Sequence, residues 1–302
     1  MKSKIKFGII GCSSIAKKLT IPAIVIGKNS VLEMIGSRSI IKAKKFAKEF
    51  ACNKFGNYDD VLNNDSVDAV YISLPMSMHE KWAIKAAKSG KHVLCEKSAT
   101  LSYVSAKKIV KECKNNNVQI MENFVFKFHP QHKKFLDLIK QNTIGNIHTF
   151  SAKYGFNLSL FNQNFRFNKK LGGGALNDVG CYLISASTFI FNDLPTSVFC
   201  NLEINNKFNI DTRGSILLTF SKNRSALVSF SYDDYFQSTY DVWGTKGLIR
   251  TERAFNVSKD MKTTIFLNQN DKIKKIPIPS ANQFQLTIED FCNKIKYDSN
   301  NN

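Results

Sequence analysis

The 302-residue sequence has no long apolar run, no paired-cysteine motif and few acidic residues. No run approaches the ~20 apolar residues that span a bilayer, and the basic N-terminus has no signal-peptide apolar region, so we expect a cytoplasmic protein. The seven cysteines are scattered, odd in number and without a C-x-x-C pair, which fits a reducing compartment better than a disulfide framework. The sequence also has no internal repeat, zinc-finger signature or helix-turn-helix signature.

Basic residues outnumber acidic ones by 43 to 24, which gives a formal net charge of +19. Such a charge attracts anions, for example nucleotide cofactors, phosphorylated or carboxylated sugars, or nucleic acid. The lysines are spread along the whole chain, which instead favours compositional bias on solvated faces and argues against a nucleic-acid partner. The length allows two domains, and 43% hydrophobic with 22% charged residues is ordinary for a globular protein.

The N-terminal apolar run ends at a glycine that small residues follow. Residues 6–10 predict a buried strand that turns at Gly11 into a helix beginning near Ser14. Backbone N–H groups and the helix dipole at such a turn can hold a phosphate. The dinucleotide fingerprint G-x-G-x-x-G/A reads Gly11-Cys12-Ser13-Ser14-Ile15-Ala16, with a serine in place of the middle glycine. Serine is small and its hydroxyl can donate to a phosphate, but the match alone also fits a plain strand–turn–helix.

Strands and helices alternate through the first part of the chain. The predicted strands are 31–36, 68–75, 92–97 and 118–122, and the predicted helices are 41–50, a segment from Ser77 to Gly90, and 101–113. This alternation predicts a doubly wound parallel sheet, whose ligands bind beyond the carboxyl ends of the strands. Gly11, Arg38, Pro75 and Lys97 all fall at these ends. The sequence therefore predicts a dinucleotide site there.

The end of the second strand indicates which dinucleotide binds. A site for NAD places an acidic side chain there for the ribose hydroxyls, whereas an arginine suits the 2′-phosphate of NADP. This chain has Ser37 and Arg38 and no acid, so we predict a preference for NADP(H), with NAD(H) possible; the alternative is an ordinary exposed arginine. The predicted cofactor-binding residues are Gly11, Cys12, Ser13, Ser14, Ile15, Ser37, Arg38, Leu74, Pro75, His79, Glu96 and Lys97.

The pattern changes after residue 123. A helix at 130–141 and a glycine-rich helix start at 172–186 accompany predicted strands at 147–152, 197–204, 215–220, 226–232, 240–243 and 248–251. Consecutive strands without intervening helices predict a largely antiparallel sheet. We therefore expect an α/β protein with a dinucleotide-binding domain at 1–122 and an α+β domain at 123–296, ending in a helix at 283–296. The Asn-rich residues 297–302 are expected to be disordered.

Four motifs occur in the order that a known family shows. They are Gly8-Ile9-Ile10-Gly11-Cys12, Gly90-Lys91-His92-Val93-Leu94-Cys95-Glu96-Lys97, Phe128-His129-Pro130 and the run from Gly172 to Tyr182. In combination they resemble the Gfo/Idh/MocA oxidoreductase family over nearly the whole chain. The sequence is similar to the branch of glucose–fructose oxidoreductase, dimeric dihydrodiol dehydrogenase and NADP-dependent xylose dehydrogenase, which has a tyrosine where other members have a histidine.

The resemblance implies a Rossmann domain followed by a domain whose open sheet often forms the subunit interface, and hence a homodimer or homotetramer. It also implies hydride transfer between the nicotinamide of NAD(P) and a carbon of a sugar, polyol or sugar derivative, including nucleotide or phosphorylated sugars. By the family's motifs, the catalytic residues are Lys97, Asp178 and Tyr182.

The chemistry of these three side chains suits such a reaction. Alcohol oxidation needs a base for the hydroxyl proton, and a nearby ammonium such as Lys97 favours the phenolate of Tyr182. Asp178 lies four residues before Tyr182, on the same helix face, where it could orient the substrate or hold Lys97. Other readings stay open, because Asp178 could cap the helix, Lys97 could be a solvated strand-end lysine, and Tyr182 an ordinary helix-face aromatic residue.

Weaker candidates surround this set. Asn123, Lys127 and Arg166 are candidates for substrate binding, although the two cations could equally be surface charges. His79 and His129 fit structural roles better than catalytic ones. His129 and His132 are one turn apart and could share a metal, but no acidic or thiol partner completes a tetrahedral set, so we expect no metal site.

Two departures from the family pattern leave a second class of function open. Ser98 replaces the proline after the catalytic lysine, so one fixed φ is lost, and Met76 replaces the asparagine after Pro75. Together with Ser13, these changes also fit a catalytically quiet dinucleotide-binding regulator or partner protein on the same fold.

Overall fold

The computed structural model describes residues 3–158 and 165–298. The chain divides into two compact units, residues 1–125 together with 284–302, and residues 126–283. In the described part of the chain, no helix combines the length and the apolarity that crossing a bilayer requires.

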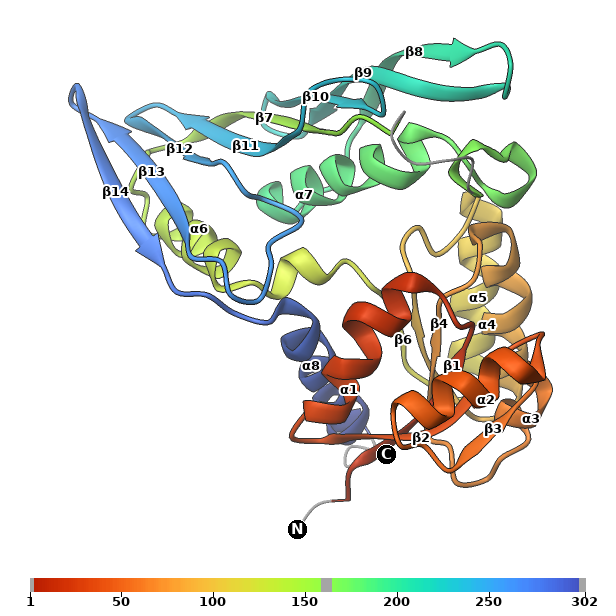
Figure 1. Ribbon diagram of the computed structural model, residues 1–302. Coiled ribbons are helices and arrows are strands. Elements are labelled where there is room, and N and C mark those ends of the chain that lie inside the picture. The colour runs from red at the N-terminus through yellow and green to blue at the C-terminus, as the bar shows by residue number, and fades with distance from the viewer. Residues whose placement is uncertain (1–2, 159–164, 299–302) are drawn as a thin grey trace. The chain divides into compact units, whose positions relative to one another are not determined.

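The first unit contains a six-stranded parallel sheet with strand order β3-β2-β1-β4-β5-β6 (Figure 1). The strands are β1 (Ile5–Ile10), β2 (Ser30–Gly36), β3 (Lys54–Gly56), β4 (Ala69–Ile72), β5 (His92–Cys95) and β6 (Ile120–Glu122). β1 pairs with β2 on one side and with β4 on the other, so the chain reverses direction across the sheet at β1. The predicted doubly wound parallel sheet is confirmed, and β1 ends at the switch point where such folds bind ligands.

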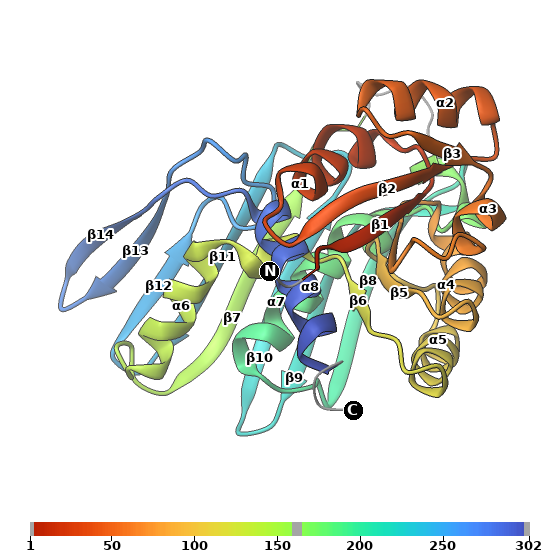
Figure 2. The same ribbon diagram turned by 90° about the horizontal axis from the view of Figure 1, so that it is seen from below.

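Helices cover both faces of this sheet (Figure 2). They are α1 (Ile21–Ile26), α2 (Ile40–Glu49), α3 (Tyr58–Leu62), α4 (His79–Lys88), α5 (Tyr103–Asn115) and α8 (Gln283–Asp298), with short turns η1 (Ala16–Thr20) and η2 (Met76–Met78). Phe7 and Ile9 of β1 pack with α1, α2 and α8, whereas the next residue, Ile10, packs with α3, α4 and α5. Both faces are buried, which explains why these strands read as continuous apolar runs.

The last helix belongs to the first unit, whereas the sequence placed it with the second domain. Phe291 of α8 is buried with its ring centroid 6.2 Å from that of Phe7. Asn29 donates from Nδ2 to the Glu289 carbonyl at 3.0 Å and to Asn293 Oδ1 at 2.9 Å. Periodicity predicts an amphipathic helix but not which sheet it covers. α8 runs two residues past the expected end, and residues 299–302 of the expected disordered tail lie outside the described residues.

The second unit contains an eight-stranded sheet with strand order β14-β13-β12-β11-β7-β10-β9-β8. The strands are β7 (Ile147–Gly155), β8 (Ser197–Asn205), β9 (Ile210–Phe220), β10 (Arg224–Ser231), β11 (Gln237–Gly244), β12 (Gly247–Thr251), β13 (Thr263–Gln269) and β14 (Lys272–Ile278). Neighbours are antiparallel except β7 and β10, so the predicted largely antiparallel sheet is confirmed. α6 (Pro130–Lys140) and α7 (Cys181–Phe191) lie on one face of the sheet (Figure 1).

The first crossover differs from the helix beginning near Ser14 that the sequence predicts. η1 is a π-helical turn, and α1 follows it directly from Ile21. Pro22 therefore lies in the first turn of α1, where a missing N–H costs little. β3, α3, β13 and β14 were not predicted from the sequence.

Candidate active site

The turn after β1 is built around Gly11, whose φ is +109°. A Cβ on this residue would lie 2.8 Å from Leu74 Cδ2 and 3.0 Å from the Ser73 carbonyl oxygen, so only glycine fits. The Gly11 N–H donates to the Gly36 carbonyl at 3.1 Å, and Ser73 Oγ donates to the Gly11 carbonyl at 2.7 Å. The turn is thus fixed against the carboxyl ends of β2 and β4, where a pyrophosphate can approach the backbone.

Ser13 stands where the fingerprint has its middle glycine. Its Oγ accepts a hydrogen bond from the Ala16 N–H at 3.1 Å, so the side chain caps η1. The hydroxyl proton stays available for an acceptor outside the turn. Ser14 is exposed and Ile15 half-buried, whereas Cys12 is buried, with burial raising the pKa of its thiol. Serine is therefore compatible with a phosphate site at this turn.

The tip of β2 presents a cation without an acidic neighbour. Ser37 is buried and Arg38 is exposed, and the first turn of α2 contains no acidic residue. Among the residues that the structure describes, Arg38 has no ion-pair partner. Ser39 caps α2 by accepting from the Lys42 N–H at 3.3 Å. Tyr58 packs edge-on against Trp82 beside Arg38, and burial raises the pKa of this phenol. Two serines and an exposed guanidinium suit a ribose 2′-phosphate.

Lys97 follows β5 in a loop of the first unit. Its neighbour Glu96 is buried, and Oε1 of Glu96 accepts from the Tyr71 hydroxyl at 2.6 Å and from Asn123 Nδ2 at 2.6 Å. Burial raises the pKa of the Glu96 carboxyl. The structure joins Glu96 and Asn123 in an interior network. The predicted contacts of Glu96 with the cofactor and of Asn123 with the substrate stay predictions. The Lys97–Ser98 peptide bond is cis.

His79 also lies in the interior, where it is 1% exposed. Its Nε2 lies 2.8 Å from the Leu74 carbonyl oxygen and its Nδ1 lies 3.0 Å from the Ser98 carbonyl oxygen. Burial lowers the pKa of this ring. Both ring nitrogens face backbone carbonyls, and the predicted cofactor contact of His79 stays a prediction. Leu74 and Pro75 remain half-buried at the end of β4.

In the second unit, Asp178 lies in the π-helical turn η6 (Leu176–Gly180) that leads into α7. Arg166 of η4 (Phe165–Phe167) donates from Nε to Asp178 Oδ2 at 2.5 Å. The side chains are 31% and 13% exposed, respectively. Although burial disfavours the cation, the Asp178 carboxylate raises the pKa of Arg166. Arg166, a predicted substrate contact, thus holds the predicted catalytic carboxylate.

The start of this helix is capped by a residue that sequence reasoning missed. Asp211 of β9 accepts from the Leu176 N–H through Oδ2. A Cβ on Gly174, whose φ is +120°, would meet Asp211 Oδ1, so glycine lets this carboxylate approach. Asp178 is therefore not the helix cap, which removes the alternative role left open above. No sequence signal marks Asp211, because the pairing joins segments 35 residues apart.

Tyr182 lies in the first turn of α7, four residues after Asp178. Its half-buried ring packs against Phe126, Tyr154 and Phe255, with centroid separations of 5.9, 5.3 and 5.7 Å. An aromatic wall of this kind limits the movement of the Tyr182 ring. Asp178 and Tyr182 come from one helical segment, and Lys97 comes from the other unit.

The remaining candidates have structural partners. Lys127 of η3 (Val125–Phe128) lies 5.8 Å from the Phe189 ring centroid. His129 caps α6 by accepting from the Gln131 N–H at 3.3 Å. His132 contacts the Tyr240 hydroxyl at 2.7 Å and the Ala254 carbonyl at 2.8 Å, and burial lowers its pKa to about 3. Across residues 3–158 and 165–298, no group of three or more His, Cys, Asp or Glu side chains gathers as a metal site requires.

Comparison with known proteins covers most of the chain. Residues 5–124 match the model of the oxidoreductase family with an NAD-binding Rossmann fold, and residues 132–250 match the GFO/IDH/MocA C-terminal domain. A dTDP-3,4-didehydro-2,6-dideoxy-alpha-D-glucose 3-reductase of Actinomadura kijaniata is 30% identical, with 96% of this chain and 87% of the relative covered. D-xylose 1-dehydrogenase (NADP(+)) 2 of Haloferax volcanii is 29% identical, with 96% and 89% covered.

Solved structures give the same result. The 3-ketoreductase KijD10 from Actinomadura kijaniata, in complex with NADP and TDP-benzene, is similar to this chain with a TM-score of 0.91. The two are 27% identical, and the match covers 98% of this chain and 91% of the ketoreductase. The aldose-aldose oxidoreductase of Caulobacter crescentus has the same fold, with a TM-score of 0.90 at 21% identity over 97% of this chain and 90% of that one.

Proposed function

Because the chain belongs to the Gfo/Idh/MocA family of oxidoreductases, we propose that it is an NADP(H)-dependent sugar oxidoreductase. It transfers a hydride between the nicotinamide and a carbonyl or carbinol carbon. The observation that carries this function is the end-to-end likeness to a 3-ketoreductase that binds NADP, in a chain that has Lys97, Asp178 and Tyr182. The seven free cysteines fit work in the reducing cytoplasm.

The first unit has the groups that NADP(H) needs. The backbone of the Gly11 turn, ahead of η1, would hold the pyrophosphate, because the first N–H groups of η1, on Ala16 and Lys17, already donate to Ser13. Ser37, Arg38 and Ser39 would hold the 2′-phosphate, since the strand tip carries a positive charge and no competing carboxylate. The Leu74–Pro75 segment lies beside the Gly11 turn and would flank the cofactor.

Three side chains take part in the proposed reaction. When bound, NADPH supplies the hydride that reduces the substrate carbonyl carbon. The Tyr182 hydroxyl gives its proton to the carbonyl oxygen, and the Lys97 ammonium stabilises the phenolate that remains. Asp178, fixed by Arg166, accepts a hydrogen bond from a substrate hydroxyl and so orients the sugar. Alcohol oxidation runs through the reverse proton transfers.

The substrate class that we propose is a keto sugar carried on a nucleoside diphosphate. Relatives spanning nearly the whole chain are named as reductases of dTDP-linked keto sugars, and the 3-ketoreductase structure holds a TDP compound. A net charge of +19 favours encounter with a diphosphate. Oxidation of a free aldose is the second candidate, because the Haloferax volcanii relative is a D-xylose dehydrogenase.

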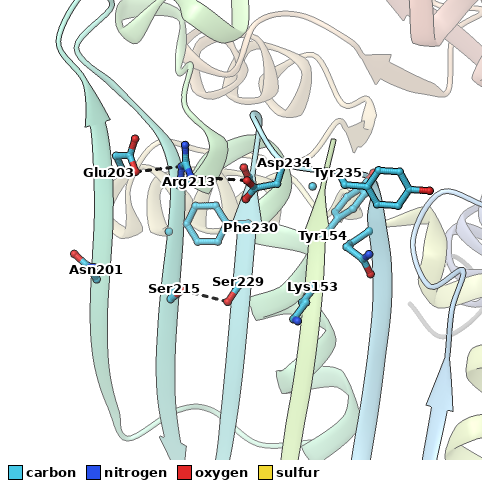
Figure 3. Close-up of a pocket in the computed structure, with 14 residues that line it drawn as sticks. Lys153, Tyr154, Asn201, Glu203, Arg213, Ser215, Ser229, Phe230, Asp234 and Tyr235 are labelled. Carbon is cyan, nitrogen blue, oxygen red and sulfur yellow. Dashed lines mark hydrogen bonds and ion pairs between the residues drawn. The ribbon is translucent and has the colours of Figure 1, made fainter. Parts of the chain in front are cut away.

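We further propose that the chain forms a homo-oligomer through the helix-free face of the eight-stranded sheet. Phe199, Leu217 and Leu227 are cross-strand neighbours on that face and are 73%, 37% and 51% exposed. Figure 3 shows the adjacent polar rows, in which Ser215 and Ser229 are hydrogen-bonded and Arg213 contacts Glu203 and Asp234. An exposed apolar row rimmed by polar groups is typical of a protein interface.

Cofactor and substrate screening tests the function. Nicotinamide fluorescence measures the affinities of NADPH and NADH, and a panel then compares dTDP-linked keto sugars, free aldoses and polyols. We expect tighter binding of NADPH and turnover of a dTDP-linked keto sugar. Turnover confined to free aldoses would favour the second candidate. NADPH binding without turnover of any sugar would contradict the proposed enzymatic function. It would favour the alternative, a dinucleotide-binding regulator or partner protein without catalytic activity.

A further inference from the structure

The loop that carries Lys97 is fixed on both sides by groups from other elements of the first unit. Before Lys97, the buried Glu96 carboxyl accepts hydrogen bonds from Tyr71 of β4 and from Asn123, which follows β6. After it, the Ala99 N–H donates to Glu122 Oε1 of β6 at 2.8 Å. Lys97 and Ser98 lie between these two contacts.

His79 makes a further contact to this loop. It lies at the start of α4 and contacts two carbonyl oxygens 24 positions apart, Leu74 after β4 at 2.8 Å and Ser98 after β5 at 3.0 Å. The ring is only 1% exposed, so contact with solvent does not explain why a polar side chain occupies this position. A neutral imidazole has one N–H, so it donates to one of these two backbone carbonyls at a time, and the tautomer decides which. It also joins two loops that both end at the ligand edge of the sheet.

We propose that His79 is a positioning residue for Lys97. By holding the Ser98 carbonyl against the end of β4, it fixes the backbone from which the Lys97 ammonium projects. The inference rests on the proposed function, in which Lys97 assists proton transfer. Ser98 has no ring to fix its own φ, so the constraint comes from the hydrogen bond instead. Displacing a catalytic group by about 1 Å costs ~10²-fold in rate, which makes such a constraint consequential.

Kinetics of His79→Phe give the first test. The phenyl ring keeps the shape and removes both nitrogens, and His79→Asn keeps one donor if the first variant does not fold. We expect kcat to fall by about 10- to 100-fold with the dissociation constant of NADPH unchanged. The matched control is His132→Phe, which removes a buried histidine with two comparable hydrogen bonds from the second unit. It should lower stability while leaving kcat of the folded protein unchanged.

Chemical labelling of Lys97 gives a readout that needs neither substrate nor cofactor. Competitive acylation with acetic anhydride, followed by peptide mass spectrometry, compares Lys97 with the exposed Lys44 on α2 as internal reference. In folded His79→Phe or His79→Asn protein, the relative reactivity of Lys97 should change, and in His132→Phe it should not.

Two results would overturn the inference. Unchanged Lys97 reactivity would show that His79 does not position it, and weaker NADPH binding in parallel with lower kcat would indicate a direct cofactor contact. The proposed function fails separately, when the wild-type protein turns over no sugar with NADPH. Changed Lys97 reactivity in such a protein would still support the positioning role.

Discussion

Arg38 is the residue on which the cofactor assignment depends. Its guanidinium is exposed at the tip of β2 and, within the described residues, lacks an ion-pair partner. Hydrogen bonds to charged groups contribute roughly 1.5–3 kcal/mol, so Arg38→Ala should weaken NADPH binding by about 10- to 100-fold. NADH binding should not change, because NADH has no 2′-phosphate. Fluorescence titration of both cofactors checks this, with Arg250→Ala on β12 as the control. An unchanged affinity ratio would remove Arg38 from the site.

His132 makes stability depend on pH in a definite direction. Its pKa is about 3 in the folded protein because the ring is buried, against about 6.5 in an unfolded chain. As the pH falls below about 6.5, the unfolded state binds the proton first, so this group removes stability until the pH reaches about 3. The slope approaches about 1.4 kcal/mol per pH unit.

Urea unfolding between neutral and acidic pH measures this effect. The wild-type unfolding free energy should fall on acidification, and His132→Gln should fall less steeply because one buried ring no longer titrates. Equal slopes in the two proteins would contradict a neutral buried His132. The lowered pKa values of His79 and His129 act in the same direction and remain in both proteins.

Individual roles were only partly predictable from the sequence. The Gly11 turn could be predicted because a glycine directly after an apolar strand is typical of a tight turn. The burial of Glu96 and Asn123 could not, because their network depends on Tyr71, which the linear pattern presents only as another apolar-strand residue. The Arg166–Asp178 pair likewise depends on the path of the chain between the two residues rather than on their spacing.

Among the elements, α8 provides the clearest stability test. Phe291 is 1% exposed and packs against Phe7 of β1, although the two residues lie near opposite ends of the sequence. Phe291→Ala should lower the unfolding free energy of the first unit by about 3–5 kcal/mol, since it leaves a cavity. Tyr297→Ala, at a 69% exposed position of the same helix, is the control and should have little effect. Equal effects on the two would show that α8 does not complete this core.

Helices and strands were predicted correctly where the hydrophobic periodicity and the length of a segment both indicated the same type of element. The parallel strands of the first unit are continuous apolar runs between helical repeats, which is distinctive. β3 has only 3 residues and was missed because so short a segment has no periodicity. β14 was missed because the exposed lysines and the apolar residues of Lys272–Ile278 do not alternate regularly. The π-helical turns η1 and η6 have no signal in apolar spacing.

For the whole molecule, the helix-free sheet face predicts self-association. Leu227→Asp introduces a charge into the apolar row that Leu227 forms with Leu217 and Phe199, and burying that charge in an interface is costly. We expect sedimentation to show a smaller species for this variant than for the wild type. Val110→Asp on α5, at a position 57% exposed in the first unit, should leave the assembly unchanged. A wild-type monomer would contradict the proposed interface.

The three proposed catalytic residues belong to different units, and this is where sequence reasoning relied on family resemblance. Lys97 belongs to the first unit, and Asp178 and Tyr182 belong to the second. Residue spacing predicts that the last two share a helical segment, but nothing in the spacing links them to Lys97. The family match extends over both units and supports the combined assignment.

Hydride transfer in a single turnover decides whether these groups act together. Enzyme loaded with NADPH is mixed with saturating keto sugar, and loss of the reduced-nicotinamide absorbance is followed for wild type, Tyr182→Phe, Lys97→Ala and Asp178→Asn. Removing the proton donor should slow this step by about 10²- to 10⁴-fold in Tyr182→Phe, with NADPH affinity unchanged. Wild-type rates in all three variants would contradict the proposed chemistry.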